Sequence, residues 1–219
     1  LNSIVHRSGG STNWDSSVGH DGDENEDKDP LFLSPLDPNS APSGAGNFRI
    51  THGSPAIDAG YNGADLDGPF GPGTNEASSI AGDLDGASRL VGSIDMGAYE
   101  FLDSDADRLS DWQEDNIYFS DADDTDSDND FMDDGDEVYA GTVLTNASSY
   151  LAMTAAQSIG TNAVIVWSSA SNRSYRLWSS TNLLGGAWNN LGVFTSTPPQ
   201  NAVTNARPPV NTYYLIGVE

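Results

Sequence analysis

The chain contains one acidic pattern twice, and the second copy begins 23 residues after the first, at Asp126 rather than Asp103. The first copy consists of Asp103, Asp105, Asp107, Asp111 and Glu114, and the second consists of Asp126, Asp128, Asp130, Asp134 and Glu137. Carboxylates this close together repel one another in a compact chain unless a cation neutralises them. The pattern therefore indicates either a pair of cation-binding loops or a solvated acidic linker.

The spacing in each copy is that of a twelve-residue calcium loop. Carboxylates fill positions 1, 3, 5, 9 and 12, and position 7, which needs only a backbone carbonyl, is Leu109 in the first copy and Met132 in the second. Oxygen ligands select calcium, because magnesium requires a tighter octahedron and zinc or copper would require His or Cys. We therefore predict at least two calcium ions, with Glu114 and Glu137 as bidentate ligands.

Position 6 of such a loop usually holds glycine, because the backbone there makes a left-handed turn. Here it is Arg108 in the first copy and Phe131 in the second. A non-glycine residue in this conformation costs on the order of 1 kcal/mol. We expect weaker calcium affinity rather than a different ion.

Charge and cysteine content limit the environment and the partners. The chain has 219 residues and a formal net charge of −25, which excludes nucleic acid as a natural partner. Residues 149–219 carry three arginines and one glutamate, so the acid is concentrated before them and a boundary is expected near Ser148. Cysteine is absent, which leaves calcium to stabilise small modules, and calcium at millimolar concentration is an extracellular condition.

Hydrophobic patterning indicates a mainly β protein with long loops. The sequence has no apolar run of 18 residues, so we expect no membrane span, and it has no long amphipathic helical periodicity. It begins at Leu1 without a charged and apolar leader, as expected for a mature fragment or for the C-terminal part of a longer secreted chain.

Residues 1–101 contain short apolar runs separated by turn residues. Their ordered motifs are Asp29-Pro30-Leu31-Phe32, Phe48-Arg49-Ile50, Ser54 to Gly60, Asp83 to Gly86 with Arg89, and Asp95 to Glu100. This set resembles the C-terminal end of the right-handed parallel β-helix domains of secreted bacterial surface proteins, the choice-of-anchor type. The resemblance implies one or two terminal coils, which cannot bury a hydrophobic face alone. We expect upstream sequence, or head-to-tail association with another subunit at Leu1–Val5, to cover them.

β-helices of this kind also occur in polysaccharide-degrading enzymes, so some carboxylates of this segment are candidate catalytic groups. The candidates are Asp58, Asp95 and Glu100, with His52 or Arg49 beside them. Asp58 and Asp95 each precede a glycine by two residues, which is typical of aspartates that bond backbone amides in turns. We expect no catalytic site.

The alternating cluster Asp21 to Asp29 lacks a closing glutamate, so it is interpreted, like Asp83-Leu84-Asp85-Gly86, as a solvated loop.

Residues 102–148 hold both acidic copies, which resemble the calcium repeats of bacterial thrombospondin type 3 proteins and share their spacing with EF-hands. The flanking apolar residues are too few for an independent core, so ion binding is expected to order the segment. Between the copies, Asp121, Asp123 and Asp124 remain open as ligands of these or further ions.

Residues 149–219 contain apolar runs at 162–168, 175–178 and 213–216, with turn signals between them. They predict a small antiparallel β-sandwich and resemble the immunoglobulin-like or fibronectin-like C-terminal domains of secreted bacterial proteins. Trp167, Trp178 and Trp188 are expected in its core, and a platform that stacks on carbohydrate is the alternative.

Together these patterns predict a secreted bacterial surface protein, structural or adhesive and not enzymatic, that forms part of a stalk or filament. The expected segments are a β-helix terminus at 1–101, a calcium-binding spacer at 102–148 and a sandwich at 149–219. The alternative is the non-catalytic C-terminal part of a polysaccharide-degrading β-helix enzyme. Expected partners are a second copy of the chain or a surface polysaccharide.

Overall fold

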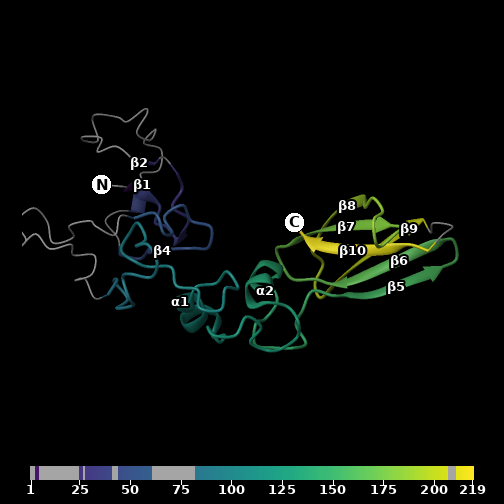
Figure 1. Ribbon diagram of the computed structural model, residues 1–219. Coiled ribbons are helices and arrows are strands. Elements are labelled where there is room, and N and C mark those ends of the chain that lie inside the picture. The colour runs from purple at the N-terminus through teal and green to yellow at the C-terminus, as the bar shows by residue number, and fades with distance from the viewer. Residues whose placement is uncertain (1–2, 5–24, 27, 41–43, 61–81, 207–210) are drawn as a thin grey trace, which may run out of the picture. The chain divides into compact units, whose positions relative to one another are not determined.

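A computed structural model describes residues 3–4, 25–26, 28–40, 44–60, 82–206 and 211–219 (Figure 1). The chain divides into two compact units. The first contains Leu1–Ser104 and Arg108–Trp112, and the second contains Asp105–Asp107 and Gln113–Glu219. Strands make up more of the structure than helices do, which confirms the mainly β class.

The first unit has short strands and a small core. Its elements are β1 (Ser3–Ile4), β2 (Asn25–Glu26), β3 (Phe32–Ser34), the 3-10 turn η2 (Pro38–Ser40) and β4 (Asn47–Ile50). β1 pairs with β2 in parallel, whereas β3 and β4 are antiparallel. The rings of Phe32 and Phe48 meet edge to face at 5.4 Å, and Ile50, Ala56 and Ile94 are buried.

Within the described residues, this unit contains one parallel strand pair of two residues on each side. That pair is too short to define a coil, and β3 and β4 form an antiparallel pair instead of stacked parallel strands. The parallel β-helix therefore stays a prediction. Most of Leu1–Val5 lies outside the described residues.

Buried carboxylates hold the loops of the first unit together. Asp95 accepts hydrogen bonds from the Asp58 N–H at 2.7 Å and from the Phe101 N–H at 2.6 Å. Glu100 accepts from the Asp95 N–H at 3.1 Å and pairs with Arg89 at 3.2 Å, and its side chain is only 2% exposed. Burial raises the pKa of Glu100 to about 7, above its ordinary value of 4.5.

Each acidic loop leads into a short helix. α1 (Asp111–Gln113) continues into the π-helical turn η4 (Glu114–Tyr118), and α2 (Asp134–Ala140) follows the second copy. Both helices end at a left-handed residue. The Phe119 N–H donates to the Glu114 carbonyl at 2.6 Å, and the Gly141 N–H donates to the Glu137 carbonyl at 2.7 Å.

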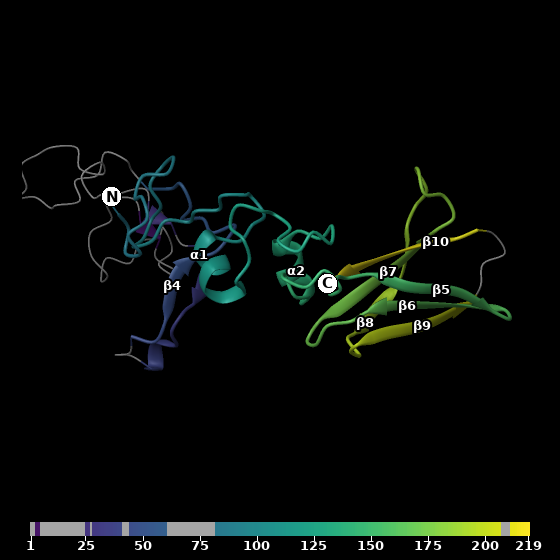
Figure 2. The ribbon, with the colours of Figure 1, turned by 90° about the horizontal axis from the view of Figure 1, so that it is seen from below.

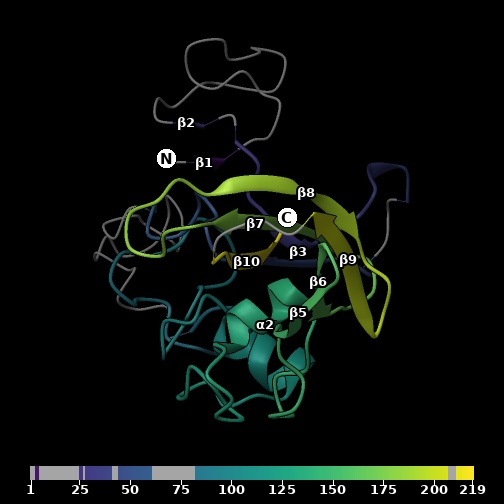
Figure 3. The same ribbon diagram turned by 90° about the vertical axis from the view of Figure 1, so that its right-hand side faces the viewer.

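Six strands follow α2 and form two antiparallel sheets. They are β5 (Met153–Ile159), β6 (Asn162–Ser168), β7 (Ser174–Ser180), β8 (Asn189–Thr195), β9 (Gln200–Ala206) and β10 (Tyr213–Val218). One sheet has the order β5-β6-β9, whose strands run side by side in Figure 2, and the other has the order β10-β7-β8. The two layers are also distinct in Figure 3.

The core of the second unit lies between these sheets. Alternate residues of β6 and β7 point inward, as the period of two in a strand requires, and the buried members are Ala163, Ile165, Trp167, Tyr175 and Leu177. The Trp167 ring meets the rings of Tyr175 and Phe194 edge to face. Trp167 is therefore a core residue as expected. Trp178 and Trp188 are half-buried, so the expectation that all three lie in the core is wrong for them, and Trp178 packs over Gly217.

The raised pKa of Glu100 predicts a pH-dependent first unit. The pKa of Glu100 is higher in the folded chain than in the unfolded chain. Its contribution to the stability of the folded state is therefore complete below about pH 4.5 and is lost as the pH rises through 7. Between pH 5.5 and 8, in excess calcium, the free energy of opening of residues 94–101 should fall by on the order of 1–2 kcal/mol. Amide hydrogen exchange, corrected for its intrinsic pH dependence, measures this.

Glu100→Gln is the control, because glutamine keeps an acceptor for the Asp95 N–H but does not titrate. The variant should show a flatter pH dependence over the same range. An equally steep dependence in the variant would contradict the assignment to Glu100.

Candidate metal centre

The two acidic loops have the same backbone conformation. Position 4 is left-handed in both, with φ of 68° at Ala106 and 63° at Asn129. Position 6 is left-handed as well, with φ of 88° at Arg108 and 76° at Phe131, as the loop pattern predicted. Strain of about 1 kcal/mol at each non-glycine residue recurs at the same positions in both copies. Both copies of the acidic pattern therefore form the same kind of loop.

Hydrogen bonds inside the loops repeat too. The N–H at position 6 donates to the aspartate at position 1 in both copies, from Arg108 to Asp103 at 3.2 Å and from Phe131 to Asp126 at 2.8 Å. These bonds close each loop around its acidic side chains.

The aspartate at position 9 binds a serine at position 2 in both copies. Asp111 accepts from the Ser104 N–H at 2.9 Å and from its Oγ at 2.8 Å. Asp134 accepts from the Ser127 N–H at 3.1 Å and from its Oγ at 2.6 Å. The sequence prediction did not include these serines, although their recurrence at the same position in both copies was a usable signal.

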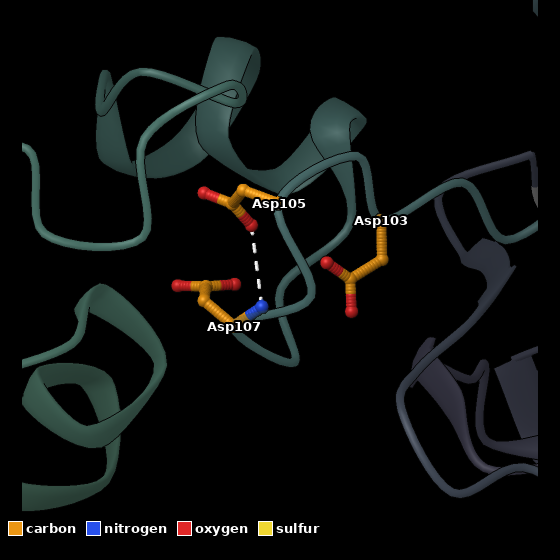
Figure 4. A group of neighbouring side chains, drawn as sticks. All are labelled: Asp103, Asp105 and Asp107. Carbon is orange, nitrogen blue, oxygen red and sulfur yellow. Dashed lines mark hydrogen bonds between the residues drawn. The ribbon is translucent and has the colours of Figure 1, made fainter.

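Two groups of carboxylates result from this geometry. In the first loop, Asp103, Asp105 and Asp107 each offer an oxygen within 4.8 Å of the others, and Figure 4 shows the hydrogen bond that the Asp107 N–H donates to the Asp105 carboxylate. The corresponding residues of the second loop, Asp126, Asp128 and Asp130, form an equivalent group. Three hard oxygen ligands at this separation suit a calcium ion.

The glutamates at position 12 are completely buried. Glu114 and Glu137 have no exposed surface, and the Oε2 atom of Glu114 and both carboxylate oxygens of Glu137 have no hydrogen-bond partner. Burial, with a smaller contribution from neighbouring aspartates, raises the pKa of Glu114 to about 8 and that of Glu137 to about 7. Buried anionic oxygens without partners are costly, and a bound cation would remove that cost.

The structure distributes the predicted ligands differently from a simple EF-hand order. Asp134 lies with Asp107 and Glu114 in a third group of close carboxylates, and not with Asp126, Asp128 and Asp130. Asp111 is bonded to Ser104 and belongs to none of the three groups. The structure therefore places Asp134 beside two carboxylates of the first loop, and the predicted ligand roles of Asp134 in the second loop and of Asp111 in the first stay predictions. Leu109 is buried, Met132 is half-buried, and their carbonyl roles stay predictions.

The remaining acidic candidates do not add to these groups. Asp121, Asp123 and Asp124 are exposed, and within the described part of the chain they are in none of the close carboxylate groups. Asp83 accepts from the N–H groups of Asp85 and Ala87 and thus fixes a turn. Most of the Asp21 to Asp29 cluster lies outside the described residues, and Asp29 itself accepts from the Leu31 N–H.

The candidate catalytic aspartates of the first unit accept hydrogen bonds from backbone amides. Asp58 accepts from the Ser93 N–H at 3.0 Å, and Asp95 bonds the amides of Asp58 and Phe101. These amides lie up to 37 residues away in sequence, so the aspartates join distant loops and do more than fix a local turn. Arg49 pairs with Asp85 and stacks on the rings of Tyr99 and Trp112 at 4.3 and 3.8 Å. His52 packs near Phe101.

The chain matches no protein-family model, no curated protein and no solved structure. Among the described residues, every helix is too short or too polar to cross a lipid bilayer.

The loop geometry predicts calcium binding that depends on the aspartates at position 3. Calorimetric titration of the chelator-treated protein should give at least two calcium ions per chain, with oxygen ligands at about 2.3 to 2.6 Å in a loaded structure. Asp105→Ala combined with Asp128→Ala should remove both sites. Asp123→Ala is the matched control, because Asp123 is exposed and lies outside the carboxylate groups. Unchanged stoichiometry in the double variant would contradict the assignment.

Proposed function

We propose that this protein is an extracellular, calcium-stabilised structural or adhesive protein of a bacterial surface, and that it is not an enzyme. The observation that carries the proposal is the repeated loop, in which each copy ends in a fully buried glutamate with unpartnered oxygens. Calcium is the cation that such oxygen ligands select, and it is abundant outside cells. Nothing in this chemistry requires a substrate.

The proposed role of the loops is to stiffen a spacer. Residues 102–148 contribute few buried apolar side chains, namely Leu109, Ala140 and Leu144. Without a cation, mutual repulsion of the carboxylates opposes their compact arrangement. With calcium bound, the free energy of binding becomes free energy of folding, and the spacer keeps a fixed geometry.

One contact supports transmission of that stiffness to the following sheets. Arg173, in the turn between β6 and β7, donates to the carbonyls of Tyr139 at 2.8 Å and Val138 at 3.0 Å, at the end of α2. A cation at the C-terminal end of a helix is favoured by the helix dipole. Gly141 lies against Ala170 and Arg173, where an added Cβ would approach within 3.1 Å. Order in the second loop would therefore fix α2 against the sheets.

For the segments we propose the β-helix terminus at 1–101, the thrombospondin type 3-like spacer at 102–148 and the immunoglobulin-like sandwich at 149–219. Two antiparallel sheets with a shared core support the last of these. A surface polysaccharide is one proposed partner, and the half-buried Trp178 is the residue that supports it. Head-to-tail self-association stays a prediction from the sequence.

The proposal predicts calcium-dependent resistance to proteases within the spacer. Arg108 and Phe131 are exposed but held in left-handed turns, which do not fit the extended conformation that a protease binds. In calcium, trypsin at Arg108 and chymotrypsin at Phe131 should cut slowly. With a chelator, both sites should be cut before the sheets of residues 153–218 are degraded. Calcium at 100 times its dissociation constant stabilises the folded spacer by about 2.7 kcal/mol per site. This lowers the population of the open, cleavable spacer roughly a hundredfold.

Magnesium at the same concentration is the control, because it prefers a tighter octahedral shell. Equal cleavage with calcium and with chelator would show that side-chain packing, rather than the ion, orders the spacer.

A further inference from the structure

A third group of carboxylates joins the two loops within the second unit. Asp107 is at position 5 and Glu114 at position 12 of the first loop, and Asp134 is at position 9 of the second. Each offers an oxygen within 4.8 Å of the other two. Their exposed fractions are 2%, 0% and 0%, so water cannot separate the charges effectively.

The duplication itself shows that this group is not a side effect of loop geometry. Asp111 and Asp134 occupy the same position and bind a serine in the same way. Only Asp134 also meets carboxylates of the other loop. The difference therefore lies in how the loops meet and not in how either is built.

Two contacts fix the group at this junction. Asp107 Oδ2 accepts from the Gly135 N–H at 2.7 Å, so an aspartate of the first loop binds the first turn of the helix that follows the second. Glu114 Oε1 accepts from Ser120 Oγ at 3.2 Å, whereas Glu114 Oε2 is buried and has no hydrogen-bond partner, and the Glu114 carboxylate offers one of its oxygens to the group. A buried anionic oxygen without a partner indicates a ligand that is positively charged.

We propose that Asp107, Glu114 and Asp134 together bind one calcium ion, so that the ion held by Glu114 of the first loop takes a ligand from the second. This inference rests on the proposed function. Because one ion then contacts both loops, ordering of the second loop raises the affinity of the first site, and the loops fold as one unit. The two calcium sites are consequently unequal, since Asp111 offers no corresponding ligand to the second loop.

The test is calorimetric titration with calcium alone in an Asp128→Ala background, which disables the Asp126, Asp128 and Asp130 group. One site should remain. Adding Asp134→Asn should raise the calcium dissociation constant of this remaining site at least tenfold, because a charged ligand is lost. Asp115→Asn is the charge-matched control, since Asp115 is exposed and lies outside the carboxylate groups, and it should change the constant less than threefold.

Further variants guard against a folding artefact. The near-ultraviolet circular dichroism of the buried Trp167 should be unchanged in each protein, and Asp134→Ser, which keeps an oxygen for Ser127, repeats the test if Asp134→Asn is unfolded. Glu114→Gln should lose at least tenfold by itself. If both side chains bind one ion, the loss in the Glu114→Gln, Asp134→Asn double variant should be smaller than the product of the two single losses.

Equal effects of Asp115→Asn and Asp134→Asn, or no effect of Asp134→Asn, would each overturn the cross-loop site. In these cases the wild-type chain still binds calcium, so the proposed function stands. A wild-type chain that binds no calcium would overturn both.

Discussion

Mutual repulsion among carboxylates, and its relief by a cation, is the constraint on which the middle of this protein depends. Glu114, Glu137, Asp107 and Asp134 are almost completely removed from water, yet the sequence of residues 102–148 contains one basic residue, Arg108. Removal of a carboxylate from water is costly unless the charge is paired or coordinated to a metal. The raised pKa values of Glu114 and Glu137 express the same cost in the absence of an ion. A bound calcium ion would turn the most unfavourable part of the chain into the part that fixes its geometry.

The helix α2 links this centre to the sheets of the second unit. Asp107 holds the start of α2 and Arg173 holds its end, so a helix of seven residues is fixed at both termini by side chains from other parts of the chain. The sheets beyond it have their own core around Trp167 and need no ion for their packing. In the first unit, aspartates and Glu100 bond backbone amides across long loops, which is a different use of acidic residues with no implied cation.

The sequence was informative where spacing determines geometry. Positions 1, 3, 5 and 6 of each loop follow from the local chain, and the left-handed Arg108 and Phe131 are as expected. Strand periodicity likewise indicated the buried residues of β6 and β7. The sequence did not reveal that Asp134 meets Glu114, because that contact depends on how two loops pack and no spacing encodes it. Strand alternation places Trp167 on the inward face of β6. Trp178 lies on the outward face of β7, and the prediction that it belongs to the core did not take strand alternation into account.

Amide hydrogen exchange of residues 103–141, compared with and without calcium, tests the central claim most directly, with the buried strands β6 and β7 as the internal reference. If calcium offsets the carboxylate repulsion, the loops and α2 should be strongly protected in calcium and should exchange rapidly with a chelator, while the reference strands change little. Equal protection of residues 103–141 in both conditions would contradict the account.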